Sequence, residues 1–285
     1  MPTRQIQQLE EELGVRLFTR TPKGMEITQA GELFLEEARN IRSVVEQATE
    51  RTQRAGQGKL GRLDVAIFGS GILDAIPKLL LAFRNDYPEV KIVLHTMTKA
   101  EQIEALRQRR ITVGFNRMLA PLPDLSTELV ATEPLLLAVN ENHPLARQKS
   151  VSFRMLAEHP MVLFPTGARP NFIDKVMRLC EEAGFVPSVS QEVGDAVTGV
   201  ALVAGGFGIC LVPESVTVLT LPGVVFRPLQ DAPANARIDL SCLCRADDQS
   251  PILSAFLATV RAFRNAAPSG PSTGIRSETG WDAGI

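Results

Sequence analysis

The chain has 285 residues, which suits about two compact domains and is long enough to bury apolar cores without disulfide or metal support. With 30 basic and 32 acidic residues the net charge is close to neutral, so any nucleic-acid-binding surface has to be a local patch. The four cysteines lie in apolar stretches, the start is polar, and no apolar run reaches about 20 residues; we therefore expect a cytoplasmic protein with reduced thiols, no secretory signal and no membrane span.

The chain begins with a predicted helix and a β-hairpin. Residues 4–13 place apolar side chains on one helical face, and Gly14 suits the position just past a helix end. Residues 15–27 read as two short strands around a turn at 21–24, which contains a proline and a glycine. Basic side chains occur in or beside this hairpin at Arg16, Arg20 and Lys23.

A long helix with an apolar seam is predicted after Thr28, which can cap it. The seam consists of small or apolar residues spaced alternately four and three, at Phe34, Ala38, Ile41, Val45, Ala48, Thr52 and Ala55. Such a heptad pattern indicates a partner helix, although an amphipathic helix packed on its own domain would carry a similar one. We favour a dimer helix because a glycine-rich linker at 56–61 follows and no neighbouring helix is available.

From Arg62 onward, strands and helices alternate. The expected strands lie at 63–68, 90–97, 111–115, 134–139, 161–164, 186–193, 207–212, 224–228 and 238–244. The expected helices lie at 73–86, 98–110, 171–184, 195–204 and 252–265. This order predicts a parallel sheet covered by helices, in two α/β subdomains that face each other.

Motifs of enzymes and metal sites are not found. The sequence contains no metal-ligand spacing, no Gly-x-Ser-x-Gly elbow and no phosphate-binding loop. Gly69-Ser70-Gly71 lacks the further glycine of a dinucleotide fingerprint, and Cys242 and Cys244 have no histidine cluster near them. We therefore expect no catalysis, no metal and no cofactor.

Several segments resemble the LysR-type transcriptional regulators. Residues 4–14, 16–20 and 27–31 are similar to the second half of that family's winged helix-turn-helix domain, with helix, wing and linker helix in the family's order. Later segments resemble the branch that controls catechol and chlorocatechol degradation: Met97–Gln102, Val113–Phe115, Leu163–Pro165 and Arg169–Phe172. The resemblance covers roughly residues 3–266 and implies an α/β protein: a partial winged helix-turn-helix, a long linker helix and two regulatory subdomains like those of periplasmic binding proteins.

The resemblance also divides the chain. We expect a remnant of the winged helix-turn-helix domain at 1–28, a linker and dimerisation helix at 29–58, an effector-binding regulatory domain at 59–266 and a disordered tail at 267–285. Subdomain I of the regulatory domain is expected at about 59–131 and 232–266, and subdomain II at about 132–231. Members carry about 30 further residues before this point, with the start of the recognition helix, so we expect a truncated form or a start that lies upstream.

Five residues are the candidates for contact with DNA. Arg4 and Gln5 lie near the start of the surviving helix and could touch backbone or bases. Arg16, Arg20 and Lys23 on the wing could neutralise phosphates or enter a minor groove. A solvated basic hairpin without DNA contact is the alternative interpretation of the wing.

The first group of candidate effector contacts follows two strands of subdomain I. Ser70 and Gly71 come after the first strand, where small residues let a ligand approach the backbone. Thr98 opens the next helix, where its hydroxyl and nearby amides could hold a carboxylate. The resemblance points to Ser70 and Thr98 as well, although each could be only a helix cap.

The second group opens a helix of the other subdomain. It comprises Arg169, Pro170, Asn171 and Phe172. Free amides at this helix start would meet the ligand's other end, and Phe172 could flank a planar or unsaturated chain. Pro170 could instead be a first-turn proline, Phe172 a core residue and Arg169 a surface residue.

The expected effector is a small carboxylate. Two facing helix starts suit an anion with a carboxylate at each end, such as muconate or chloromuconate, and benzoate is the alternative. The resemblance implies a homo-oligomer, a dimer through the linker helix and further a tetramer, that binds promoter DNA, with RNA polymerase as an additional partner to consider. The competing hypothesis is a truncated effector-binding or oligomerisation module without specific DNA binding.

Overall fold

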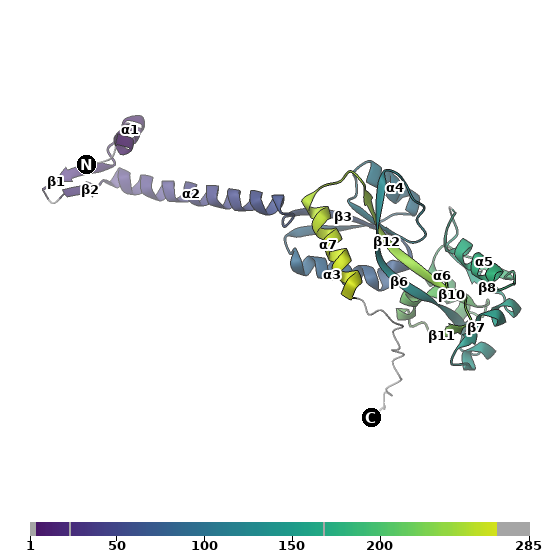
Figure 1. The fold of residues 1–285 in the computed structure, drawn as a ribbon. Coiled ribbons are helices and arrows are strands. Elements are labelled where there is room, and N and C mark those ends of the chain that lie inside the picture. Colours follow the sequence, from purple (N-terminus) through teal and green to yellow (C-terminus); the bar gives the residue numbers. More distant parts are fainter. Residues whose placement is uncertain (1–3, 23, 168, 267–285) are drawn as a thin grey trace, which may run out of the picture. The chain divides into compact units, whose positions relative to one another are not determined.

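A computed structural model describes residues 4–22, 24–167 and 169–266 (Figure 1). The predicted disordered tail at 267–285 and the candidate DNA contact Lys23 lie outside the described residues. The chain divides after Gln57, within the glycine-rich segment 56–61, into two compact units.

The N-terminal unit has the order helix, hairpin, long helix that the sequence predicts. Helix α1 spans Arg4–Leu13 and ends at Gly14, whose φ of 69° suits a residue without a side chain. Strands β1 (Phe18–Thr21) and β2 (Gly24–Ile27) pair antiparallel, and helix α2 spans Gln29–Gly56. The first strand begins three positions later than expected, at Phe18 instead of Val15.

The junction between hairpin and α2 is held by the predicted cap residue. The Thr28 hydroxyl accepts a hydrogen bond from the Gly31 backbone N–H at 3.0 Å and donates one to the Arg16 carbonyl at 2.7 Å. Leu17 is buried beneath it and is 3% exposed. A Cβ on Gly31 would lie 2.1 Å from the Leu17 carbonyl oxygen, so only glycine allows α2 to approach the hairpin this closely.

Helix α2 exposes a row of large apolar side chains within its unit. Leu33, Ile41, Val44 and Val45 are between 57% and 64% exposed. Ile41 and Val45 belong to the predicted seam, while its first two members, Phe34 and Ala38, are half-buried. No described residue of this unit covers the middle of the seam, as a helix that awaits a partner requires.

The first subdomain of the second unit is the predicted parallel β-sheet with helices on both faces. Strands β3 (Gly61–Ile67), β4 (Val90–Thr96) and β5 (Val113–Asn116) are parallel, in the order β4-β3-β5. Helices α3 (Ala75–Asp86) and α7 (Pro251–Ala266) pack on one face and α4 (Lys99–Arg107) on the other (Figure 1). Alternate residues of a strand face opposite sides, so Val65 joins the core under α3 while Ala66 joins the core under α4.

Two long strands continue this sheet into the second subdomain. Strand β6 spans Leu125–Asn140 and β12 spans Arg237–Arg245, and they pair antiparallel over the full length of β12. The far half of β6 pairs with β10 (Cys210–Pro213) and β11 (Val224–Gln230). The sequence analysis placed the start of β6 at residue 134; this was wrong because residues 125–133 mix short polar and apolar groups, with neither a strict alternation nor a long apolar run.

The second subdomain is built on shorter elements. Its remaining strands and α-helices are β7 (Val151–Ser152), β8 (Met161–Leu163), β9 (Val189–Glu192), α5 (Phe172–Glu182) and α6 (Ala196–Ala204). Its 3-10 turns are η2 (Pro144–Arg147), η3 (Phe153–Glu158) and η4 (Glu214–Val218). β8 and β9 are parallel, and this subdomain buries a continuous apolar core of its own. The residue boundaries expected for the two subdomains stay predictions.

Within the described ranges, three further observations bear on function. No helix there is both long enough and apolar enough to cross a bilayer. No group of three or more potential ligand side chains is arranged to hold a metal ion there. All four cysteines are free and buried, and burial raises the pKa of Cys180 to about 11, so this thiol stays protonated near neutral pH.

The close approach at Gly31 generates a stability prediction for the N-terminal unit. Gly31→Ala should destabilise the hairpin–α2 junction by about 2 kcal/mol, because the added Cβ collides with the Leu17 carbonyl and the Ile27 side chain. Amide hydrogen exchange over residues 17–31 measures this as lost protection. Gly56→Ala is the matched control: no atom lies within 4 Å of its added Cβ, and it should stabilise α2 by up to about 1 kcal/mol. Equal protection at 17–31 in both variants would contradict the prediction.

Candidate functional site

Ser70 and Gly71 lie on a short 3-10 turn rather than at the start of a long helix. The turn η1 spans Gly69–Leu73, and α3 begins only at Ala75, which corrects the expectation that one helix runs over 73–86. Ser70 is buried at 8% exposure, and η1 packs against the end of β5 and against η4. A Cβ on Gly71 would lie 2.8 Å from the end of the Leu240 side chain, so a larger residue there would displace that side chain.

Thr98 caps α4 in a complete capping box. Its side chain accepts a hydrogen bond from the Glu101 backbone N–H. In return the Glu101 carboxylate accepts from the Thr98 backbone N–H at 2.7 Å and from its hydroxyl at 2.8 Å. These hydrogen bonds, that of the backbone first, hold the pKa of Glu101 below its usual range. The chain's own carboxylate therefore occupies the place at which an effector carboxylate was expected.

The start of α5 is occupied in the same way. The Asn171 side chain accepts from the Ile173 N–H at 2.9 Å and donates to the Pro165 carbonyl at 3.1 Å. The Asp174 carboxylate accepts from the Asn171 N–H at 2.7 Å and from Arg169 at 2.6 Å. The Asn171 hydrogen bond is the largest cause that lowers the pKa of Asp174. A capping box therefore satisfies part of the amides that were expected to be free at this helix start.

Phe172 belongs to the core of the second subdomain. It is 6% exposed, and its ring lies 5.2 Å from the ring of Phe164. Phe172 therefore lies in the core, the alternative that the sequence analysis left open for it. Only one edge of its ring could border a ligand.

Lys99, which the sequence analysis missed, brings Thr98 and Pro170 to one place. Its ammonium donates to the Met118 carbonyl at 2.9 Å and to the Pro170 carbonyl at 3.1 Å. It therefore joins α4 and the end of β5 in the first subdomain to the start of α5 in the second. Burial lowers the pKa of Lys99, and the charge of Asp174 opposes that shift. A lysine in the first turn of a helix, where a positive charge is unfavourable, was the available signal.

Arg117 is a second functional candidate that the sequence analysis missed. It follows β5, and its side chain pairs with Glu133 on β6 and reaches the Ser215 hydroxyl on η4 at 3.5 Å. Ser215 in turn donates its backbone N–H to Glu133 at 2.7 Å. The Nε and Nη1 atoms of Arg117 are buried and have no hydrogen-bond partner among the described residues. Its position at the carboxyl end of a parallel strand was the available signal.

Such unpartnered donors are unusual. Leaving a buried donor unsatisfied costs about 1–3 kcal/mol, and more for a charged group. The Nε–H and Nη1–H groups lie on different edges of the planar guanidinium, so each can donate to an oxygen of an anion, but one carboxylate does not bridge both. Because η1 packs against both β5 and η4, Ser70 belongs to the same neighbourhood as Arg117. Among the described residues, an anion bound here would supply hydrogen-bond acceptors that the Arg117 donors lack.

A buried amide pair fixes the loops around this place. The Gln102 side chain accepts from the Asn116 side chain at 2.6 Å and donates to the Met97 carbonyl at 2.9 Å. Gln102 is fully buried, and a Cβ on Gly114 would lie 2.3 Å from its side-chain oxygen. The pair thereby ties the loop before Thr98 to the end of β5, next to Arg117.

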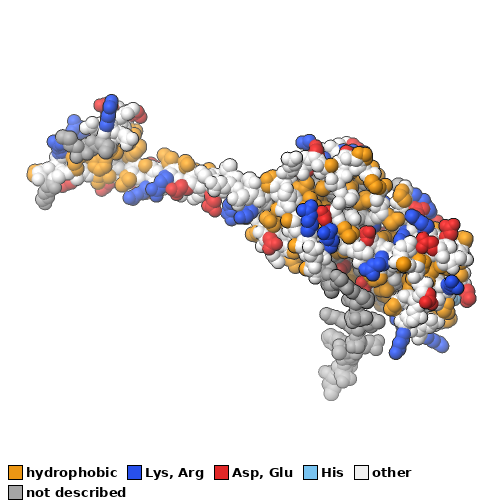
Figure 2. All heavy atoms as spheres, viewed as in Figure 1, with side chains coloured by type: hydrophobic (Ala, Val, Ile, Leu, Met, Phe, Trp, Pro, Cys, Tyr) orange, Lys and Arg blue, Asp and Glu red, His pale blue; other side chains and the backbone are white. Residues whose placement is uncertain are grey.

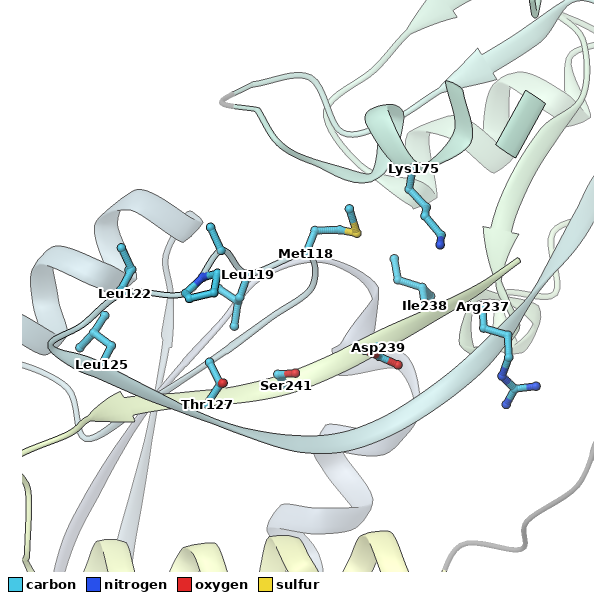
Figure 3. Close-up of a pocket in the computed structure, with 12 residues that line it drawn as sticks. Met118, Leu119, Leu122, Leu125, Thr127, Lys175, Arg237, Ile238, Asp239 and Ser241 are labelled. Carbon is cyan, nitrogen blue, oxygen red and sulfur yellow. The ribbon is translucent and has the colours of Figure 1, made fainter. Parts of the chain in front are cut away.

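A separate cavity of about 350 Å³ lies beside these elements (Figure 3). Its lining comes from the loop after β5, from β6 and β12, and from α5. None of the seven effector residues predicted from the sequence lines it.

The predicted DNA contacts are exposed on the N-terminal unit. Arg4 and Gln5 begin α1, and Arg16 and Arg20 border a hollow between α1 and the hairpin. The hairpin is held against α1 by Glu10, whose carboxylate accepts from the backbone N–H groups of two hairpin residues at 2.7 and 3.0 Å. Figure 2 shows Lys and Arg side chains on this unit, as a phosphate-binding surface requires. Lys23 lies outside the described residues.

The Arg117–Glu133 pair generates a stability prediction. Both side chains are about nine-tenths buried, at 13% and 12% exposure, so Glu133→Gln leaves a buried guanidinium without its anion. We expect a loss of about 3 kcal/mol in the free energy of unfolding, measured by urea denaturation. Asp124→Asn, which breaks the solvent-exposed pair with Arg107, is the control and should change stability little. Similar losses of stability in both variants would contradict the prediction.

Two known protein families match the chain, one at its N-terminal end and one over most of the rest. Residues 2–32 match the family described as bacterial regulatory helix-turn-helix protein, lysR family. Residues 56–264, most of the chain, match the LysR substrate binding domain.

Individual proteins match over nearly the same length. The HTH-type transcriptional regulator TcbR of Pseudomonas sp. (strain P51) is 37% identical over 91% of this chain and 87% of its own length. The crystal structure of CbnR, a LysR family transcriptional regulator, superimposes with a TM-score of 0.84 at 37% identity, covering 91% of this chain and 89% of CbnR. CbnR complexed with its target DNA gives a TM-score of 0.80 at 35% identity, covering 92% and 88%.

A further structure holds a small molecule. The BenM effector binding domain with its effector benzoate superimposes with a TM-score of 0.65 at 29% identity, covering 71% of this chain and 91% of that domain. The matched relatives are named as transcription regulators, in agreement with the prediction that the chain is not an enzyme. The helix and wing, the long helix and the paired α/β subdomains are those of a single family, and the chain belongs to the LysR family of transcriptional regulators.

Proposed function

We propose that this LysR-family regulator controls an operon for degradation of aromatic compounds and responds to a small organic acid bound between its two subdomains. The observation that carries the effector site is the buried Arg117 guanidinium, which has two unpartnered donors at the meeting point of β5, β6 and η4. An effector carboxylate oxygen at Nε or at Nη1 would satisfy one of them without displacing either capping box. Ser70, Gly71, Thr98, Arg169, Pro170, Asn171 and Phe172 are proposed to surround it.

The proposed effector class is muconate or chloromuconate, with benzoate as the second candidate. The resemblance of the chain to the catechol and chlorocatechol branch supports the first. The name of the BenM structure, in which benzoate is the effector, supports an aromatic monoacid. Lys99 favours an anion in either case, because its half-buried ammonium adds positive potential beside Pro170.

The proposed mechanism uses the two strands that run through both subdomains. A ligand shifts a conformational equilibrium only by its differential affinity for the two states. An effector that contacts Arg117 on one side and the α5 start on the other would favour one arrangement of the subdomains about β6 and β12. In an oligomer, that change would alter the spacing of the DNA-binding units.

The remaining partners follow from the family and from α2. We propose a cytoplasmic homodimer through the exposed apolar side chains of α2, a tetramer built from such dimers, and promoter DNA as the target of α1 and the wing. The name of the CbnR structure with its target DNA supports the last of these. A contact with RNA polymerase is the least supported of these proposals.

One observation favours the alternative function, an effector-binding module without specific DNA binding. Helix α1 carries apolar side chains but buries none of its residues, and Leu13 is 42% exposed. A recognition helix without packing of its own would not hold its base-contacting side chains in place.

DNA binding separates the two functions. Fluorescence anisotropy of this 285-residue chain should show preferential binding to DNA from its own promoter over scrambled DNA at fixed salt. Arg16→Ala together with Arg20→Ala should weaken binding to both DNAs and flatten its salt dependence, since these side chains are proposed to contact phosphates. Equal weak binding of the unaltered chain to both DNAs would favour the effector-binding module.

Effector affinity tests the residues around Arg117. Ser70→Ala and Thr98→Ala should each raise the Kd for cis,cis-muconate about fivefold, the equivalent of a lost polar contact of about 1 kcal/mol. Thr98→Ser keeps the hydroxyl and the capping box and should bind as the unaltered chain does, and Ser43→Ala on α2 is a further control. Isothermal titration calorimetry gives the Kd, and unchanged values in both alanine variants would place the site elsewhere.

A further inference from the structure

Two histidines of the second subdomain lie in contact, away from the effector residues and the cavity. His143 directly precedes η2, and His159 directly follows η3. The centroids of their rings are 4.6 Å apart, and the rings stand nearly perpendicular, at 76°. We propose that this pair is an acid-sensitive latch, which holds the corner formed by β6, η2 and η3 at neutral pH and releases it when His143 takes up a proton.

The latch depends on the uncharged form of His143. Its Nδ1 atom accepts a hydrogen bond from the Leu145 backbone N–H at 3.2 Å, so the imidazole is the N-cap of η2. A ring nitrogen accepts a hydrogen bond only while it carries no proton, and in the charged imidazole both nitrogens are donors. Protonation of Nδ1 therefore removes the cap, since a second donor would then face the Leu145 N–H.

The surroundings of His143 oppose a positive charge on its ring. Burial is the larger cause that lowers the pKa of His143, and the charge of His159 is the second. Two strands pack against η2: the last seven residues of β6 carry no charge, and Arg227 of β11 donates from Nε and Nη2 to the Ala146 carbonyl at 3.1 and 2.7 Å. The remaining charged side chains of this turn and of η3 are exposed: Glu141, Arg147, Lys149, Arg154 and Glu158.

The corner that the latch holds is the far end of β6. The His143 backbone N–H donates to the Asn140 carbonyl at 2.9 Å, and the Asn140 side chain donates to the Ala204 carbonyl at 2.7 Å. The turn after β6 is thereby tied to the end of α6. Because β6 pairs in both subdomains, release of this corner would weaken the attachment of the shared strand within the second subdomain.

The latch should weaken as the pH falls. The folded corner disfavours the charged imidazole, so its stability is complete above the usual histidine pKa of about 6.5 and is lost below that value. The loss levels off once the pH is below the lowered pKa of His143. Loss of a helix cap corresponds to about a fivefold change in an equilibrium constant, so hydrogen-exchange protection of residues 143–148 should fall about fivefold.

The test is amide hydrogen exchange of the full chain at about pH 7.5 and about pH 5, corrected for intrinsic exchange rates, together with an NMR titration of the three histidines. His143→Asn keeps a side-chain acceptor at the cap and cannot titrate, so protection of residues 143–148 should not fall in this variant. His159→Gln removes the neighbouring charge, so His143 should titrate at a higher pH. His95→Gln removes the histidine that contacts Asp64 and is the matched control, which should leave both measurements unchanged.

Three outcomes would overturn the proposal. They are equal protection of residues 143–148 at both pH values in the unaltered chain, the same fall in His143→Asn, and a titration of His143 that His159→Gln does not move. His95→Gln and His159→Gln each remove one of the other two histidine signals, so His143 is identified even if His143→Asn does not fold. These measurements use neither DNA nor an effector, so they stand apart from the proposed function.

Discussion

The backbone hydrogen bonds of β6 are the constraint on which the regulatory unit depends. One half of this strand pairs with β12 in the first subdomain, and the other half pairs with β10 and β11 in the second. Both subdomains therefore share a continuous strand, and neither can turn without bending it. Arg117, Glu133 and the cavity floor all lie along this connection, so a ligand placed there acts on the element that joins the two cores.

The polar groups around the connection are of two kinds. The helix starts at Thr98 and Asn171 are satisfied by carboxylates of their own first turns, Glu101 and Asp174. Arg117 is charged and buried, and two of its donors lack partners among the described residues. An incoming carboxylate gains the most binding free energy where buried donors already lack acceptors, because it need not displace an internal hydrogen bond. This difference moves the centre of the proposed effector site from the helix starts to the end of β5.

The sequence predicted the sites less completely than it predicted the fold. Thr98 and Asn171 were identified as helix starts, which they are, but their amides were expected to be free. Their capping partners, Glu101 and Asp174, lie three residues along and are readable in the sequence. Lys99 and Arg117 were missed because each is a single basic residue beside an ordinary strand or helix. Only the contacts of Lys99 with Pro170, 71 positions away, make it part of a site.

By itself the sequence determined the local and periodic features of this protein. Helix caps, turn glycines, the heptad seam of α2 and the alternation of strands and helices are short-range patterns, and the family follows from motifs in fixed order. Tertiary structure alone decided which residues from distant segments meet. The length of β6, the requirement for glycine at position 31, the unpartnered donors of Arg117 and the cavity beneath Lys175 all arise from close packing between segments that are not neighbours in the chain. Packing of this kind depends on three-dimensional distances, which spacing along a sequence does not contain.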